Sequence, residues 1–530
     1  MKNKIFILDS TLRDGAQGQG ISFSVEDKLK IVKALDKLGI DYIEAGNPGS
    51  NQKDLEFFKR IKDIKLEKSK VVAFGSTRRA DVTVEEDKNL KSLLEANTET
   101  VVIFGKSDSF QVTEILKTSL DENLEMIKDT IEYLVSKGKN VMFDAEHFFD
   151  GYKRNQEYAM NTLEVAKEAG VHTLVLCDTN GGSLQGEILE ITKNVKETLG
   201  IIIGVHTHND MGLAVGNSLM AVEGGATHIQ GTFLGIGERC GNANLSAIIP
   251  TLELKLGYEV LSKDKLKEIK STAMYISEIC NIPLKDDMPY IGESAFAHKG
   301  GMHIDAVCKI PVSYEHVKPE LVGNSRRFLV SEVSGKSTIY NQIKKLFPNF
   351  KKDSEEVLLV TERLKELEYE GYQFEGADGT VELVIRKTMG KYKPFFELKQ
   401  FKVIGEQPSY GGEFSATAMV ELTVDNNYEI TAAQGQGPVN ALDKALRKAL
   451  EKFYPLLSSV RLVDYKVRVL DSDKTTASRV RVLIESTDGE EKWSTVGVSE
   501  DIIQASWIAL VDSIEYKLIK DIERKVKTYF

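Results

Sequence analysis

The chain lacks the features that mark secreted, membrane-spanning and nucleic-acid-binding proteins. Its 530 residues include four cysteines, Cys177, Cys240, Cys280 and Cys308, with no Cys-x-x-Cys pair, so neither a disulfide framework nor a cysteine zinc site is expected. No run of about 18 apolar residues is present, which excludes a membrane-spanning helix. The formal net charge is −11, so no overall positive field attracts nucleic acid or anionic lipid.

The composition is otherwise that of a folded, water-exposed protein. Hydrophobic residues make up 42% and charged residues 28% of the chain, as in ordinary globular proteins. The segment 1–9 turns acidic too soon for a signal peptide. We therefore expect a cytoplasmic protein in a reducing compartment, with small-molecule partners rather than nucleic acid or a membrane. The length predicts about three domains, or one large barrel with additions.

A short apolar run, a polar turn and an amphipathic segment alternate from residue 5 to about residue 257. The apolar runs are residues 5–8, 41–45, 70–74, 100–104, 140–143, 172–177, 201–206 and 228–233. Within the helical segment 24–38, Ser24 and Asp27 resemble a capping box, and Gly39 stands where a left-handed residue ends the helix. Eight such units predict a (β/α)8 TIM barrel over residues 1–270, with an open doubly wound sheet as the alternative.

The seventh predicted strand carries two histidines at its carboxyl end. Side chains alternate between the two faces of a strand, so His206 and His208 point the same way and can share a cation. Imidazole suits a transition-type divalent metal. On this pair alone, two hydrogen-bonded polar residues at a strand end are an equal alternative.

Polar side chains follow most of the other predicted strands as well. Since the carboxyl ends of barrel strands form the active-site face, these side chains should converge. Their convergence with the histidines predicts a metal and anion site. The candidates are Arg13, Asp14, Gln17, Glu44, Asn47, Lys106, Ser107, Glu146, Thr179 and Asn242.

Two further parts follow the predicted barrel. Residues 271–390 form a helical linker region that contains the segment 296–303 and, shortly after it, Tyr314. Residues 391–530 alternate strand-like runs (395–403, 416–424, 459–470, 478–484 and 493–497) with helices at 439–453 and 501–518, which predicts an α+β domain. Composition alone leaves open whether that domain is oligomerising or regulatory.

With these residues in view, the chain resembles the acetyl-CoA-dependent enzymes that condense 2-oxo acids, namely the 2-isopropylmalate, homocitrate and citramalate synthases. The resemblance is carried by four motifs and extends to about residue 340. They are Asp9-Ser-Thr-Leu-Arg-Asp-Gly-Ala-Gln17, His206-Thr-His-Asn-Asp210, Gly235-Ile-Gly-Glu-Arg-Cys-Gly-Asn242 and His298-Lys-Gly-Gly-Met-His303. The last 140 residues or so are similar to the family's amino-acid-sensing domain.

Within the family, the segments 42–51 and 103–107 are most similar to the citramalate synthases. Isopropylmalate synthases usually carry His-Thr-Phe at the end of the fourth strand, where this chain has Val102-Ile103-Phe104. This departure argues against a large branched 2-oxo acid and suits a smaller acceptor, pyruvate.

The resemblance implies the metal ligands Asp14, His206, His208 and Asn242 for Mg²⁺, Mn²⁺ or Zn²⁺. A 2-oxo acid chelates such an ion through its carboxylate and keto oxygens. Arg13 would donate hydrogen bonds to the keto oxygen, Glu44 would hold Arg13, and Thr179 would bind the substrate carboxylate. Gln17 would position the acetyl-CoA thioester. Asn47, Lys106 and Ser107 complete the predicted substrate-binding set.

The second half of the reaction needs a base to remove a proton from the acetyl methyl group. Glu146 is the candidate at the barrel mouth, and His303 with Tyr314 is the candidate beyond the barrel. The resemblance implies that His303 and Tyr314 enter the barrel of another subunit of a homodimer. It also implies that isoleucine acts as an effector through residues 391–530.

Two other functions remain open on the sequence. The same chemistry could use a larger 2-oxo acid, as in 2-isopropylmalate or homocitrate synthase. A metal-dependent aldolase or lyase could use the same barrel motifs, but it would not need His303, Tyr314 and the terminal domain.

Overall fold

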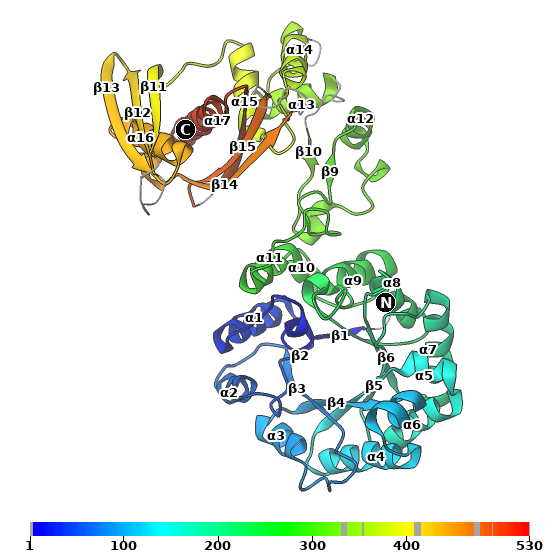
Figure 1. The fold of residues 1–530 in the computed structure, drawn as a ribbon. Helices are drawn as coiled ribbons and strands as arrows, with labels where there is room; N and C mark the ends of the chain where they lie inside the picture. Colours follow the sequence, from blue (N-terminus) through cyan, green and yellow to red (C-terminus); the bar gives the residue numbers. More distant parts are fainter. Residues whose placement is uncertain are drawn as a thin grey trace. The chain divides into compact units, whose positions relative to one another are not determined.

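The computed structural model describes residues 4–329, 336–351, 354–406, 415–470, 478–489 and 491–528. The chain divides into two compact units (Figure 1). The first contains Met1–Phe296 and Val317–Arg326, and the second contains Ala297–His316 and Arg327–Phe530. No helix of the described ranges combines the length and the apolar character needed to cross a bilayer.

The first unit is built on a closed, parallel, eight-stranded barrel, which confirms the predicted fold. Its strands follow the order of the sequence, and β1 closes the ring by pairing Phe6 with His228 and Asp9 with Gly231 of β8. Figure 1 looks into this ring. The strands are β1 (Phe6–Asp9), β2 (Tyr42–Glu44), β3 (Lys70–Ser76), β4 (Thr100–Lys106), β5 (Asn140–Glu146), β6 (Thr173–Asp178), β7 (Ile202–Thr207) and β8 (His228–Gly231).

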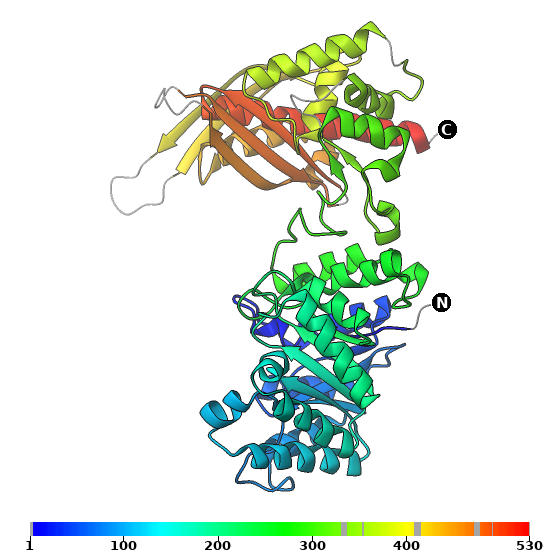
Figure 2. The same ribbon diagram turned by 90° about the vertical axis from the view of Figure 1, so that its right-hand side faces the viewer.

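Helices surround the strands and begin and end at the residues that the sequence marks (Figure 2). Ser24 and Asp27 form the expected capping box, and Gly39 ends the first helix with φ of 97°. The helices between strands are α1 (Val25–Leu38), α2 (Gln52–Ile61), α3 (Lys88–Ala96), α4 (Leu120–Ser136), α5 (Phe148–Arg154), α6 (Gln156–Glu168), α7 (Gln185–Leu199) and α8 (Ala214–Glu223). The unit continues with α9 (Leu245–Thr251), α10 (Lys263–Leu266) and α11 (Ile269–Cys280).

The barrel interior is apolar in its middle and polar toward the carboxyl ends of the strands. Leu8, Val72, Val102 and Met142 form a buried cluster separate from the larger core between strands and helices. Two residues further along their strands, Phe74, Phe104 and Asp144 reach the next layer. The apolar layer therefore forms the floor beneath the polar residues at the mouth.

The second unit begins with β9 (Ala297–His298), which pairs with β10 (Arg327–Phe328). Helices α12 (Gly301–Lys309), α13 (Lys336–Leu346), α14 (Glu355–Tyr369) and α15 (Asp378–Thr388) follow in sequence. Helix α15 is joined to the last helix of the chain by ion pairs, including Lys387 Nζ to Asp512 Oδ1 at 3.1 Å.

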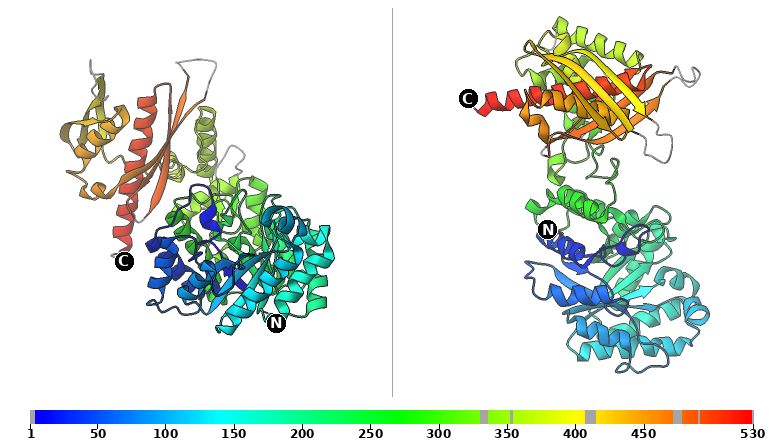
Figure 3. Two further views of the ribbon diagram at one scale, coloured as in Figure 1. Left: turned by 60° about the horizontal axis from the view of Figure 1, so that its bottom comes forward. Right: turned by 60° about the vertical axis from the view of Figure 1, so that its left-hand side comes forward.

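The end of the chain repeats one pattern of three antiparallel strands and a helix. The first copy comprises β11 (Glu397–Glu406), β12 (Ser415–Val424), β13 (Asn427–Gly435) and α16 (Pro438–Leu450), and the second comprises β14 (Arg461–Val469), β15 (Val480–Thr487), β16 (Lys492–Ser499) and α17 (Ile502–Thr528). The two views of Figure 3 show α16 and α17 lying along their sheets. This confirms an α+β domain.

The sequence interpretation missed β13 and therefore the repeat. Two residues with positive φ, Asp425 at 45° and Asn426 at 67°, make the tight turn that leads into this strand. The strand lies at a sheet edge, and Tyr428 and Ile430 on it are 59% and 50% exposed. Its apolar alternation is consequently weak, although the Asp-Asn pair was a usable turn signal.

Candidate functional site

The carboxyl ends of the barrel strands enclose a cavity of about 230 Å³. Seven of the residues that the sequence analysis gave a role line it, together with six to which it assigned no role. The lining residues are Arg13, Asp14, Gln17, Phe74, Phe104, Asp144, Glu146, Cys177, Thr179, His206, His208, Glu238 and Arg239.

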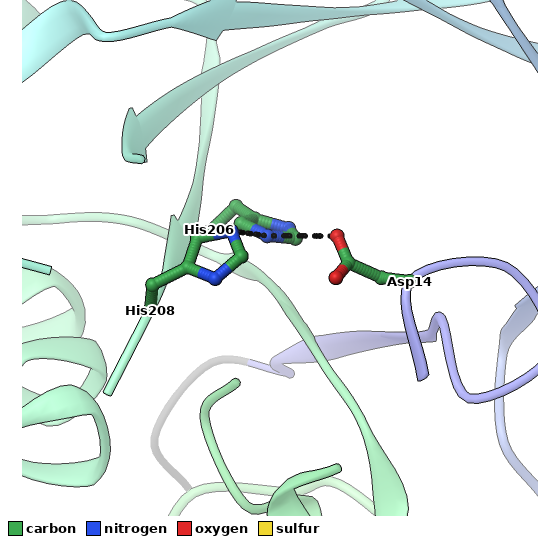
Figure 4. A group of neighbouring side chains, drawn as sticks. All are labelled: Asp14, His206 and His208. Carbon is green, nitrogen blue, oxygen red and sulfur yellow. Dashed lines mark hydrogen bonds and ion pairs between the residues drawn. The ribbon is translucent and has the colours of Figure 1, made fainter. Parts of the chain in front are cut away.

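Asp14, His206 and His208 lie together in this cavity, although Asp14 is almost 200 residues from the histidines (Figure 4). Nε2 of His206 lies 3.4 Å from Nε2 of His208 and 3.6 Å from Oδ2 of Asp14. One ligand atom from each residue lies within 4.8 Å of the others. The two imidazoles and the carboxylate thus face a common point.

The protonation of these side chains suits cation binding. Burial, and then the charge of His206, lowers the pKa of His208 to about 4, so its imidazole is neutral at neutral pH. Burial opposes ionisation of Asp14, but the Arg13 guanidinium and the two histidines hold the pKa of Asp14 well below its ordinary value. A neutral imidazole and an anionic carboxylate are the forms that bind metal.

Asn242 reaches the same place from the loop that follows β8. Its Nδ2 donates to Oδ1 of Asp14 at 2.9 Å, and a backbone bridge sets it beside His208. Its Oδ1 is buried and has no hydrogen-bond partner among the described residues. A buried acceptor without a partner is costly, and a cation would satisfy it.

Glycines allow this loop to fold so tightly. A Cβ on Gly237 would lie 2.1 Å from Nδ2 of Asn242, and a Cβ on Gly241 would lie 2.0 Å from the carbonyl oxygen of Gly235. Both residues also have positive φ, at 156° and 87°. Glycine is therefore needed at positions 237 and 241, because a side chain at either position would collide with Asn242 or with the backbone of Gly235.

Arg13 is held on three sides. Its Nε donates to Oε2 of Glu44 at 2.6 Å, its Nη1 donates to Oδ2 of Asp14 at 2.7 Å, and its guanidinium carbon lies 3.8 Å from the ring centre of Phe74. Burial lowers the pKa of Arg13, but the two carboxylates outweigh it and raise the pKa above its ordinary value. Arg13 is thus a fixed, permanently charged donor at the cavity wall.

Taken together, the donors fit a divalent cation. Two imidazole nitrogens, a carboxylate and an amide oxygen form a mixed N/O set that leaves positions open for a ligand. Asp14, His206, His208 and Asn242 would hold the ion, and the orphaned oxygen of Asn242 is the observation that favours one.

Other predicted residues line or adjoin the cavity. Glu146 is at the end of β5, and its Oε2 lies 2.6 Å from Nζ of Lys106. The hydroxyl oxygen of Thr179 accepts a hydrogen bond from the backbone N–H of His147 at 2.8 Å. Gln17 lines the cavity from the turn after β1 and is exposed.

Two predicted substrate-binding residues are placed elsewhere. Ser107 is fully buried, and its Oγ accepts a hydrogen bond from Thr162 at 2.8 Å. Asn47 stabilises its own loop, since its Oδ1 accepts from the backbone N–H of Gly49 at 2.9 Å. Neither lines the cavity, because one packs against a helix behind the strand end and the other bonds within its own turn.

His303 and Tyr314 belong to the second unit, where they meet each other. Their ring centres are 4.2 Å apart and their planes differ by 28°, so the rings stack. Tyr314 is 50% exposed, and His303 is also exposed. The pair is accessible on the second unit.

Sequence reasoning assigned no role to three residues that face the cavity from their strands, although it placed Asp144 among the polar residues at the end of the fifth strand. Phe74 and Phe104 stack with ring centres 5.2 Å apart, while Asp144 accepts a hydrogen bond from Gln230. Burial, and then the charge of Glu44, raises the pKa of Asp144. Alternation offered a signal, because each of these residues lies an even number of positions from an inward-facing residue on its own strand.

Three family models match consecutive parts of the chain. The HMGL-like model matches residues 4–276, the homocitrate synthase post-HMGL domain-like model matches residues 290–371, and the LeuA allosteric (dimerisation) domain matches residues 375–518.

Curated relatives match almost the whole chain. An (R)-citramalate synthase of Aquifex aeolicus is 51% identical, covering 99% of this chain and 100% of the relative. An (R)-citramalate synthase of Geobacter sulfurreducens is 50% identical and covers 98% of both chains. A probable 2-isopropylmalate synthase of Archaeoglobus fulgidus is 30% identical and covers 97% of both.

Proposed function

The chain belongs to the (R)-citramalate synthase family of enzymes, and we propose that it condenses acetyl-CoA with pyruvate. The products are (R)-citramalate and CoA. A new bond joins the acetyl methyl carbon to the keto carbon, and water cleaves the thioester. The enzyme is thus an acyltransferase that converts the acyl group into an alkyl group on transfer.

The observation that carries the proposal is the shared cavity of Arg13 and the cation ligands. A divalent ion there would polarise the keto group of the acceptor and stabilise the negative charge that forms on its oxygen. Arg13 donates hydrogen bonds to the same oxygen, and Glu44, Asp14 and Phe74 hold its guanidinium in place. Donors that are fixed before the reaction need no reorganisation as charge develops.

The cavity walls favour a small acceptor. Thr179 accepts from the His147 N–H, which leaves its own hydroxyl hydrogen for the substrate carboxylate. The stacked rings of Phe74 and Phe104 supply an apolar wall suited to a methyl group. Gln17 positions the thioester of acetyl-CoA. Pyruvate has a group for each of these features: a carboxylate for Thr179, a keto group for Arg13 and the cation, and a methyl group for the aromatic wall.

We propose Glu146 as the base that removes the methyl proton, with His303 and its neighbour Tyr314 as the alternative. Glu146 lines the cavity, and the ammonium of Lys106 lies 2.6 Å from it. Glu146→Gln and His303→Asn, compared by solvent exchange of the acetyl methyl protons, separate the two. The variant that stops exchange identifies the base.

We also propose a domain organisation, an oligomeric state, a location and an effector for this chain. The barrel (1–270), linker (271–390) and regulatory (391–530) parts would form a cytoplasmic homodimer that isoleucine inhibits. Support comes from the match of residues 375–518 to an allosteric and dimerisation domain. Titration of the full chain with isoleucine, leucine and valine tests the effector, and a response no stronger to isoleucine than to the others contradicts it.

A thiol-release assay tests the reaction. The full chain is supplied with acetyl-CoA, a divalent metal and, in turn, pyruvate, 2-oxobutanoate, 2-oxoisovalerate or 2-oxoglutarate. We expect CoA release with pyruvate and its loss on chelation. A preference for 2-oxoisovalerate would replace the proposal with the isopropylmalate reaction.

A further inference from the structure

We propose that Gln230 and Asp144 act as positioning residues that fix the tautomer of His206 and thereby prepare its Nε2 for a cation. The inference rests on the proposed metal site and adds two residues to it. Neither residue is among the ligands, and neither belongs to the motifs that define the family resemblance.

A hydrogen-bonded chain crosses the barrel interior. Nδ1 of His206 lies 2.9 Å from Oε1 of Gln230, and Nε2 of Gln230 donates to Oδ1 of Asp144 at 2.9 Å. His206 and Gln230 are neighbours in the register of β7 and β8, whereas Asp144 reaches them from β5, three strands from β8. All three residues are at least 96% buried, so water has little access to these bonds.

This row of hydrogen bonds determines which atom of each group donates. Nε2 of Gln230 donates to Oδ1 of Asp144, which accepts as an ionised carboxylate or with the proton on its other oxygen, so the NH₂ end of Gln230 faces Asp144. The carbonyl end of Gln230 then faces His206, and Nδ1 of His206 must supply the hydrogen. Nε2 of His206 consequently keeps its lone pair, directed toward Asp14 and His208.

The reversed arrangement is disfavoured. If the Gln230 amide turned by 180°, its oxygen would face Oδ1 of Asp144, which could bond to it only by carrying a proton on that oxygen, and its NH₂ group would require an unprotonated Nδ1 on His206. The proton of a neutral His206 would then lie on Nε2, where it would block a metal ligand. Asp144 therefore acts on the metal site through Gln230 without touching the ion.

The test exchanges the two groups. The double variant with Gln230→Glu and Asp144→Asn keeps the direction of both hydrogen bonds. The new carboxylate at position 230 accepts from His206, and the new amide at position 144 donates to that carboxylate. Gln230→Glu alone brings two carboxylates together, and Gln230→Met removes the acceptor with little change in volume. Outer partners of this kind typically alter metal affinity about 10–100-fold.

Calorimetric titration of the chelator-treated full chain with Mn²⁺ provides the readout, together with the thermal midpoint of each variant. We expect Gln230→Met and Gln230→Glu to bind Mn²⁺ about 10–100-fold more weakly and the double variant to recover to within about threefold of the parent. Asn217→Leu is the matched control. It removes a buried amide that donates to the Ser183 carbonyl, and it should lower the midpoint without changing Mn²⁺ affinity.

The outcomes separate this inference from the proposed function. Unchanged affinity in Gln230→Met, or a double variant no better than Gln230→Glu, overturns the positioning role while leaving the metal site in place. If Gln230→Glu fails to fold, Gln230→Met and the double variant decide. Absence of Mn²⁺ binding by the parent chain would instead contradict the proposed metal site, and the inference would fall with it.

Discussion

The central guanidinium carbon of Arg13 lies 3.8 Å from the ring centre of Phe74. This contact and the hydrogen bond to Glu44 together restrict the movement of the Arg13 side chain. The position of a donor in the turn after β1 thus depends on an aromatic ring of β3.

Replacing Arg13 by lysine should abolish most of the activity. A lysine keeps the charge but loses the planar fork that bonds Glu44 and Asp14 together. Loss of one fixed donor of this kind typically costs about 10²–10³-fold in kcat. Steady-state CoA release measures the effect, and circular dichroism confirms that the variant is folded. Turnover near that of the parent would exclude the proposed role.

Shortening Phe104 should broaden the acceptor range. Phe104→Leu removes part of the aromatic wall beside Phe74 and enlarges the cavity. One methylene in an apolar pocket is worth about 10–200-fold in selectivity, so we expect the ratio of kcat/KM for 2-oxobutanoate over pyruvate to rise about tenfold. Phe110→Leu, at an exposed phenylalanine that does not line the cavity, is the control. An unchanged ratio argues against an apolar wall at Phe104.

Adding a methyl group to Gly237 should weaken metal binding through Asn242. The new Cβ would lie 2.1 Å from Nδ2 of Asn242, so that side chain must move. Gly257→Ala also places a Cβ at a positive φ, 72°, but meets no atom within 4 Å, so it controls for the strain of an alanine at positive φ without a contact to Asn242. We expect both variants to melt lower and only Gly237→Ala to bind Mn²⁺ about tenfold more weakly. Equal Mn²⁺ affinities of Gly237→Ala and Gly257→Ala would show that Asn242 does not contribute to metal binding.

His228 should destabilise the barrel in mild acid. Burial lowers its pKa to about 4 from an ordinary value of 6.5, and its Nε2 has no hydrogen-bond partner among the described residues. The unfolded chain therefore binds a proton between those pH values while the folded chain does not. The stabilising contribution of the neutral His228 ring is fully present above pH 6.5. As the pH falls toward 4, titration of His228 lowers the free energy of unfolding by up to about 3 kcal/mol.

Thermal midpoints of the parent and His228→Leu between pH 8 and pH 4.5 measure this effect. The thermal midpoint of the parent should fall further between pH 8 and pH 4.5 than that of His228→Leu, because the variant lacks the titrating ring. Parallel curves would show that His228 is not the group responsible.

Local patterns were enough to predict the barrel and much of its mouth. Ser24 and Gly39 delimit a helix through bonds to their own neighbours, and His206 and His208 share a face because a strand alternates. Interactions of this range depend on a few consecutive residues, so the sequence alone determined them.

Closure of the barrel decided the rest. Only the meeting of β5 with β7 and β8 across the interior joins Asp144 to Gln230 and His206. The same closure leaves Ser107 buried behind the strand end instead of at the cavity. Which polar side chains meet depends on contacts between residues tens of positions apart, and no local periodicity records these contacts.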